Sequence, residues 1–184
     1  MSGIALIRPG GARGAGLLQA MVVLLVLATL CAIAWPDLQA LLDRQRAASA
    51  RHLLSSHLAF ARMAAIRRQV EVSMCASRDG LQCAGADDWQ HGWIIHLNRP
   101  EHAGPLAAED VLHQHALYPP SGWRIRASQG RPFIRFLDNG RALGTNLSLW
   151  VCRNDQPFGR VVVNNSGRIR SERQGRKPDP CAQP

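Results

Sequence analysis

The chain has 184 residues, a formal net charge of +9 and five cysteines. Even when an N-terminal leader and a membrane helix are set aside, this length leaves about 150 residues, which is enough for one domain with a hydrophobic core. The positive charge is compatible with a polyanion or a membrane surface as partner, and by itself it indicates nothing further. No internal repeat or low-complexity tract is present, which argues against a repeat protein.

An apolar block runs from Ala15 to Trp35, after a short leader that ends at Gly14 and before Pro36. As a helix, this block would be about 30 Å long, which is enough to cross the core of a bilayer. A secretory signal has a small-residue cleavage site after its apolar stretch, and no such site follows Trp35. A cut after Gly14 would leave the helix on the mature protein, whereas an uncut signal anchor would retain the leader as well.

The cysteines divide into one inside the apolar block and four outside it. Cys31 lies in the block and is expected to be unpaired. The other four form an even set, as expected in an oxidising compartment: Cys75, Cys83, Cys152 and Cys181. None of them has the paired Cys-x-x-Cys spacing of a zinc site. Two disulfides are therefore expected, and Cys75–Cys83 with Cys152–Cys181 is favoured among the three possible pairings.

Helical periodicity continues beyond Pro36 to about Arg68, so the proline is expected to interrupt the helix at most by a kink. The apolar residues of this segment form one stripe at helical spacing: Leu54, Leu58, Ala61 and Ala65. Residues 70–75 then alternate, with Val70, Val72 and Met74 on one face and Glu71, Ser73 and Cys75 on the other, which predicts a half-buried strand.

Short strands fill the rest of the chain. They are expected at Trp93–Leu97, Val111–Tyr118, Trp123–Ala127, Phe133–Leu137, Leu147–Cys152 and Arg160–Asn164, with a last one after the turn Asn165-Ser166-Gly167. Asp138-Asn139-Gly140 is the clearest turn between strands. A helix followed by consecutive strands indicates an α+β fold rather than repeated βαβ units.

Four segments occur in a characteristic order: LAFARMAAIRRQVEVSMCASRDGLQC, DDWQHGWIIHL, IRFLDNGRALG and GRVVVNNSGRIR. Together with the leader, they resemble the GspH/FimT family of type IV minor pilins and type II secretion pseudopilins. The resemblance implies a type IV pilin-like fold, in which a long N-terminal helix packs on an antiparallel, two-sheet C-terminal domain. It divides the chain into a prepilin leader (1–14), a transmembrane helix (15–36) and a periplasmic or extracellular domain (37–184).

The leader also resembles the family's cleavage site. Gly14 stands at the cut, Ala15 replaces the usual phenylalanine, Gln19 replaces the usual glutamate, and Pro36 lies where the family has a proline. Cleavage by a prepilin peptidase and methylation of Ala15 are therefore expected. Gln19 lacks the carboxylate thought to pair with a neighbouring subunit's amine, which favours a minor or tip position in the filament.

The C-terminal end of the chain is basic. From Arg153 onward, the basic residues Arg153, Arg160, Arg168, Arg170, Arg173, Arg176 and Lys177 outnumber Asp155, Glu172 and Asp179. Resemblance to FimT-like members implies a DNA-binding Gly-Arg-x-Arg loop at residues 167–170. Gly167 would permit the turn, Arg168 and Arg170 would face one way, and Arg160, Arg173, Arg176 and Lys177 would extend a basic patch for sequence-independent phosphate contact. The alternative is a solvated hairpin whose arginines protect an edge strand.

Other candidate residues favour structural roles. The tryptophans at strand positions are expected in the core rather than stacked on bases: Trp89, Trp93, Trp123 and Trp150. His113 and His115 would share a strand face, but spacing offers no third ligand, so neither a metal nor a cofactor is expected. The common catalytic motifs are absent from the sequence, and no enzyme activity is expected.

Two functions follow from the sequence. The first is a minor type IV pilin that binds DNA and supports DNA uptake and pilus biogenesis. The second is a purely structural minor pilin or pseudopilin for pilus assembly or type II secretion. Either protein would have a single-pass helix in the inner membrane and a periplasmic domain, and would join other pilins in a pilus or pseudopilus at the cell surface.

Overall fold

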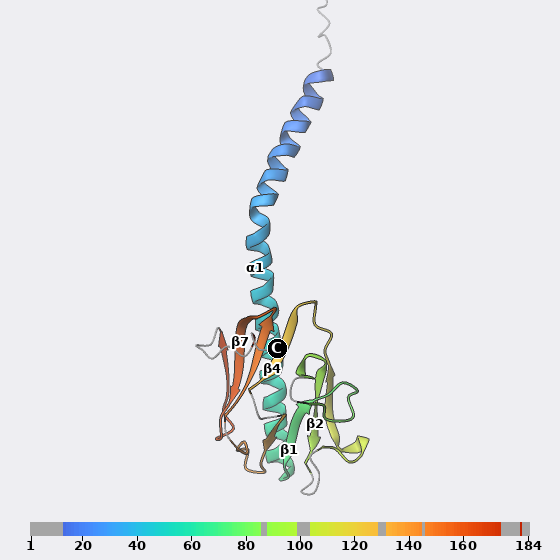
Figure 1. Ribbon diagram of the computed structural model, residues 1–184, viewed down its shortest axis with the longest axis vertical. Coiled ribbons are helices and arrows are strands. Elements are labelled where there is room, and N and C mark those ends of the chain that lie inside the picture. Colours follow the sequence, from blue (N-terminus) through green and yellow to red (C-terminus); the bar gives the residue numbers. More distant parts are fainter. Residues whose placement is uncertain are drawn as a thin grey trace, which may run out of the picture. The chain divides into compact units, whose positions relative to one another are not determined.

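The computed structural model describes residues 13–85, 88–98, 104–128, 132–144, 146–173 and 181. Its first element is the helix α1 (Arg13–Arg68), which continues through Pro36 (Figure 1). The chain forms two compact units, Met1–Asp43 and Arg44–Pro184.

The first part of α1 is apolar and exposed. Its side chains from Gly16 to Leu42 are exposed, including the large apolar Leu24, Leu25 and Ile33. By length and composition, α1 is the one helix among the described residues that is able to cross a membrane. The helix begins at Arg13, so the expected cut between Gly14 and Ala15 falls in its first turn.

The second unit contains two four-stranded antiparallel sheets (Figure 1). The first sheet has the order β3-β2-β1-β5, formed by β1 (Val72–Ala76), β2 (Gly92–Leu97), β3 (Val111–Ala116) and β5 (Phe133–Phe136). The second has the order β4-β6-β7-β8, formed by β4 (Trp123–Ala127), β6 (Leu147–Arg153), β7 (Gln156–Val163) and β8 (Ile169–Arg173). Short 3-10 helices lie at Asp88–Gln90 and Ala108–Asp110. The α+β, pilin-like fold class is therefore confirmed, and each expected strand is present with boundaries shifted by a few residues.

One core unites both sheets with the second part of α1. The expected helical stripe is fully buried at Leu54, Leu58, Ala61 and Ala65. Trp89, Trp93 and Trp123 lie in the same core, while Trp150 forms a small separate cluster with Cys152 and Cys181. The core assignment of these tryptophans is confirmed, so their rings are not available for stacking on bases.

β1 differs from the expected half-buried strand. It begins at Val72 and is buried on both faces, because it lies between β2 and β5 inside the first sheet. Val72 and Met74 face the core, while Ser73 and Cys75 face the opposite side. Ser73 donates a hydrogen bond of 3.3 Å to Asn98 Oδ1, and Cys75 is disulfide-bonded, so the polar face is covered as well.

Two disulfides are present, joining Cys75 to Cys83 and Cys152 to Cys181. This is the pairing that was favoured from the sequence. Cys181 is fully buried beside Trp150, so the second disulfide attaches the C-terminal end of the chain to the second sheet. Cys31 is a free cysteine.

Candidate nucleic-acid interface

The expected Gly-Arg-x-Arg loop is a tight turn between β7 and β8. The side chain of Asn164 organises it, because Asn164 Oδ1 accepts hydrogen bonds of 2.8 Å from the Arg168 backbone nitrogen and from Ser166 Oγ. The Gly167 nitrogen donates to the Asn164 carbonyl at 2.8 Å, and the Asn164 nitrogen donates to the Arg168 carbonyl at 3.2 Å. The turn therefore has a defined conformation that does not depend on a ligand.

Gly167 is required by packing within the domain. Its φ of +74° is in the left-handed region that favours glycine, and its position is buried. A Cβ at this position would overlap the carbonyl oxygen of Gly140 and would lie 3.1 Å from Arg62 Nε. The glycine thus serves the turn by contacting Gly140, and its backbone does not lie open to a phosphate as the sequence had suggested.

A second turn with a similar sequence lies against the first. In Asp138–Arg141, Gly140 has a φ of +77°, and the Arg141 nitrogen donates to Asn139 Oδ1 at 3.0 Å. The Ala142 nitrogen donates to the Asn165 carbonyl at 3.1 Å, which joins the two turns. Arg62 of α1 fixes the junction through a 2.9 Å hydrogen bond from its Nε to the Gly140 carbonyl.

This junction adds Arg141 to the expected basic residues. Arg141 is exposed and directly follows Gly140, as Arg168 directly follows Gly167. Sequence reasoning missed Arg141 because the contact between the turns is a tertiary one. The available signal was the repeated Gly-Arg pair, each preceded by turn-forming polar residues.

Arg168 and Arg170 present their charge to solvent. Both are exposed, and among the residues the structure describes neither has an acidic partner. Arg168 lies immediately before β8, whereas Arg170 is within β8 and pairs with Val162 of β7. Guanidinium groups in this setting are suited to contact phosphate oxygens without reading bases.

Arg160 lies on the same face of the sheet as Arg170, but its charge is paired. Arg160 is opposite Glu172 across the β7–β8 pair, and Arg160 Nη2 lies 2.7 Å from Glu172 Oε2. The guanidinium also lies 4.9 Å from the ring centroid of Trp150. This arginine therefore contacts Glu172 and Trp150 on the surface of the sheet, and it contributes less net charge to the basic patch than the sequence suggested.

Arg173 is directed to the opposite face of β8. It pairs with Gly159, whose Cβ direction points at Arg51 of α1. Burial, and then the charge of Arg173, lower the pKa of Arg51. Arg173 is exposed, but it does not share a face with Arg170. Arg176 and Lys177 lie outside the described residues.

The two histidines predicted to share a strand face do so, and His57 of α1 packs against them. The ring centroid of His57 is 4.6 Å from that of His113 and 5.2 Å from that of His115. Trp93 Nε1 donates a 2.9 Å hydrogen bond to His57 Nδ1, so the lone pair of that nitrogen is already used as an acceptor. Burial, followed by the charges of His113 and His115, lowers the pKa of His57 to about 4.

A long N-terminal helix, an apolar exposed first half and two antiparallel sheets define the type IV pilin-like class of fold. The family described as Type II transport protein GspH matches residues 50–167, and the chain belongs to this family. It is accordingly a minor pilin or pseudopilin, a class of structural filament components.

One solved minor pilin structure supports this fold, and a second, less similar structure was also found. The type IV minor pilin FimU of Pseudomonas aeruginosa is 22% identical, with a TM-score of 0.60 over 76% of this chain and 97% of that chain. The minor pseudopilin EpsH from the Type 2 Secretion System of Vibrio cholerae is 14% identical, with a TM-score of 0.47 over 71% of this chain and 98% of that chain. A search of curated proteins gave no match.

Proposed function

We propose that this minor pilin binds DNA without sequence preference and supports DNA uptake by a type IV pilus. The site consists of Arg168 and Arg170, extended by Arg141 from the neighbouring turn. The observation that supports this most is that both arginines of the Gly-Arg-x-Arg loop are exposed and, among the described residues, have no acidic partner, although Arg160 next to them is paired.

The rigidity of the turn supports the same proposal. A turn whose backbone is already ordered loses less conformational freedom when its side chains bind, so two arginines on an ordered turn bind phosphates better than two on a mobile one. The contact of Gly167 with Gly140 and the hydrogen bond from Arg62 both limit movement of the loop. Arg173 faces away from Arg170 and is assigned a minor, long-range role, and Arg176 and Lys177 are assigned the same role by their sequence positions.

The remaining steps of the proposal follow the family. A prepilin peptidase cuts between Gly14 and Ala15, the apolar part of α1 anchors the chain in the inner membrane, and the domain lies in the periplasm before it joins other pilins. The protein needs no cofactor and catalyses no reaction in this scheme.

A structural role without DNA is the alternative, and one observation favours it. β8 is the edge strand of the second sheet, and exposed arginines on an edge strand discourage pairing with other chains. This role accounts for Arg170, which is within β8, but less well for Arg168 and Arg141, which lie in turns.

A titration of the full-length chain in neutral detergent tests the proposal. Two duplexes of unrelated sequence should bind with similar affinity at each of two salt concentrations. The logarithm of the binding constant should fall by about 0.9 per neutralised phosphate for each tenfold rise in salt. Absence of binding at low salt, or a strong preference for one duplex, would favour the structural role.

A further inference from the structure

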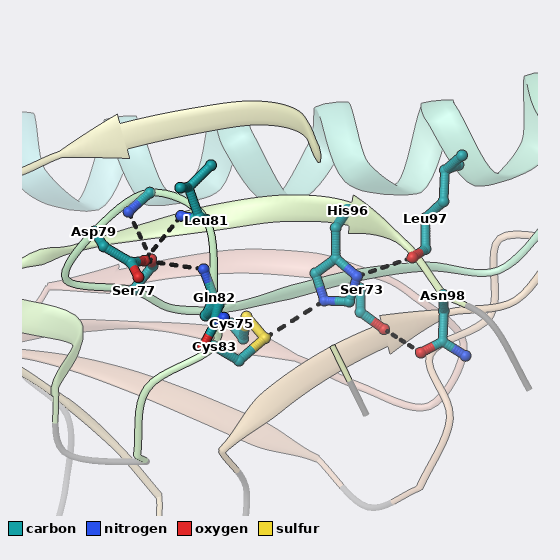
Figure 2. The surroundings of a disulfide bond; sticks show 11 residues. Ser73, Cys75, Ser77, Asp79, Leu81, Gln82, Cys83, His96, Leu97 and Asn98 are labelled. Atoms are coloured by element: carbon teal, nitrogen blue, oxygen red, sulfur yellow. Dashed lines mark hydrogen bonds between the residues drawn. A yellow bond between two sulfur atoms is a disulfide. The ribbon is translucent and has the colours of Figure 1, made fainter. Parts of the chain in front are cut away.

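His96 lies against the first disulfide on the polar face of the first sheet. Its Nε2 is 3.5 Å from Cys83 Sγ, and the ligand atoms of Cys75, Cys83 and His96 all lie within 4.8 Å of one another (Figure 2). His96 is fully buried, Cys75 is almost fully buried, and Cys83 is partly exposed. Approach from solvent is therefore open on the Cys83 side.

The tautomer of His96 follows from its other contact. His96 Nδ1 lies 2.9 Å from the Leu97 carbonyl oxygen, as drawn in Figure 2. A carbonyl only accepts hydrogen bonds, so Nδ1 carries the proton and a neutral ring directs the Nε2 lone pair towards Cys83. A backbone carbonyl that accepts from the non-coordinating nitrogen is the usual orienting contact of metal-binding histidines.

The spacing also suits a tetrahedral ion. Zinc lies about 2.3 Å from a thiolate sulfur and about 2.0–2.1 Å from an imidazole nitrogen, so these two atoms lie about 3.6 Å apart in a tetrahedral site. The observed separation of Cys83 Sγ and His96 Nε2 is 3.5 Å. In the dithiol form the two sulfurs must also move apart, and each can do so by rotating about its own side-chain bonds.

The loop that holds Cys83 is fixed by hydrogen bonds as well as by the disulfide. Asp79 Oδ1 accepts 2.9 Å hydrogen bonds from the backbone nitrogens of Leu81 and Gln82, shown in Figure 2. The Ala84 nitrogen donates to the Ala76 carbonyl at 2.7 Å, immediately beyond the two cysteines. The dithiol form is therefore expected to keep Cys83 near Cys75 and His96.

We propose that Cys75, Cys83 and His96 form a binding site for a thiophilic divalent cation of the zinc class in the dithiol form of the protein. The disulfide closes this site. Opening it requires a reductant of the dithiol or phosphine class, which supplies two electrons as the disulfide takes up two protons to give two thiols. A divalent cation then displaces one proton from each thiol, and His96 Nε2 donates its lone pair. A newly made chain passes through this dithiol form before oxidation.

Cobalt and zinc titrations of the full-length chain in neutral detergent test the site. The chain is reduced anaerobically with a phosphine and titrated with Co²⁺, whose thiolate charge-transfer absorption reports sulfur ligation. One equivalent should bind, and Zn²⁺ should displace it. The oxidised chain should bind at least a hundredfold more weakly. The Cys75→Ser/Cys83→Ser variant, which keeps the other three cysteines, should lose the absorption band.

The role of His96 is tested by His96→Gln against the matched variant His52→Gln, which changes an exposed histidine of α1. His96→Gln should weaken Zn²⁺ binding at least tenfold, and His52→Gln should leave it unchanged. Because His96 is buried and its variant can misfold, X-ray absorption of the zinc-loaded parent provides a second measurement. Two sulfurs and at least one imidazole nitrogen are expected. Three results would overturn the proposal. They are a zinc site with four sulfur ligands, a folded His96→Gln variant that binds Zn²⁺ as tightly as the parent, and an oxidised chain that binds Zn²⁺ as tightly as the reduced one.

Discussion

Gly167 in the β7–β8 turn packs directly against the backbone carbonyl of Gly140 in the turn after β5. The same carbonyl accepts a 2.9 Å hydrogen bond from Arg62 Nε of α1. Segments far apart in the sequence therefore meet at this point, which brings the turns that precede Arg141 and Arg168 into contact. The basic loop is part of the folded domain rather than an appendage.

Replacement of Gly167 should disturb this junction. Gly167→Ala places a Cβ against the Gly140 carbonyl and forces a left-handed conformation on alanine, so unfolding free energy should fall by about 2 kcal/mol or more. Denaturant unfolding measures the change. Gly85→Ala is the matched control, because Gly85 has no atom within 4 Å of its Cβ direction, and it should change stability by no more than about 0.5 kcal/mol. Equal stability of the two variants would contradict this account of the turn.

The sequence predicted the elements of this region but not their contacts. Asn165-Ser166-Gly167 and Asp138-Asn139-Gly140 were identifiable as turns because glycine and asparagine adopt their backbone conformations locally. Their mutual contact depends on how β5 and β8 are placed by separate sheets, which local patterns do not encode. For the same reason, Arg141 was missed, and the pairing of Arg160 with Glu172 was not anticipated.

β1 illustrates another limit. Alternation of Val72 and Met74 with polar residues indicates one buried face, and that face does pack on the core. The other face is buried by a disulfide, Asn98 and His96, which come from later in the chain. Alternating polarity therefore does not prove that the polar face of a strand is exposed, because polar side chains can be buried when they have partners in the fold.

Glu172 should restrain DNA binding by neutralising Arg160. In Glu172→Gln, Arg160 becomes available to a phosphate, so affinity at low salt should rise and the salt slope should steepen by about 0.9. The half-exposed ion pair contributes about 1 kcal/mol or less, so the fold should persist. The control is Asp155→Asn, which gives the same change in net charge in the turn before β7, where Asp155 pairs with Arg124 of β4. An equal gain in both variants would mean that net charge alone determines binding.

The two disulfides should differ in their contributions to stability. The chain-entropy estimate gives about 2.5 kcal/mol for a loop of 8 residues and about 3.6 kcal/mol for one of 29, the sequence separations of Cys75–Cys83 and Cys152–Cys181. Cys152→Ser/Cys181→Ser should therefore cost about 1 kcal/mol more than Cys75→Ser/Cys83→Ser. It should also loosen the cluster around Trp150. Unfolding of both double variants under non-reducing conditions measures the difference, and a larger loss in Cys75→Ser/Cys83→Ser would contradict the estimate.

Acid should weaken the packing of α1 on β3 through His57. The pKa of His57 is lowered to about 4 in the folded chain from an ordinary value of 6.5, so the unfolded chain takes up the proton first. The contribution of neutral His57 to the free energy of unfolding is therefore complete above pH 6.5 and declines as the pH falls towards 4. Protonation would also place a hydrogen on Nδ1, which accepts from Trp93.

Thermal unfolding at a series of pH values between about 7 and 4 tests this. In His57→Gln, an uncharged amide oxygen can accept from Trp93, so the variant should lose less stability on acidification than the parent. His52→Gln should follow the parent, because His52 is exposed on α1. If His57→Gln and the parent lose the same stability over this range, His57 is not the acid-sensitive group.

The central claim is that Arg168 and Arg170 bind phosphates, and the salt dependence of DNA binding by one double variant tests it most directly. The comparison is between Arg168→Gln/Arg170→Gln and Arg44→Gln/Arg67→Gln, which removes two exposed arginines from α1 and makes the same change in net charge. The first variant should weaken binding to all duplexes alike and reduce the salt slope by roughly two units, whereas the second should resemble the parent. If folded Arg168→Gln/Arg170→Gln binds DNA as tightly as the parent, with the same slope, the loop is only a hairpin and the structural role is correct.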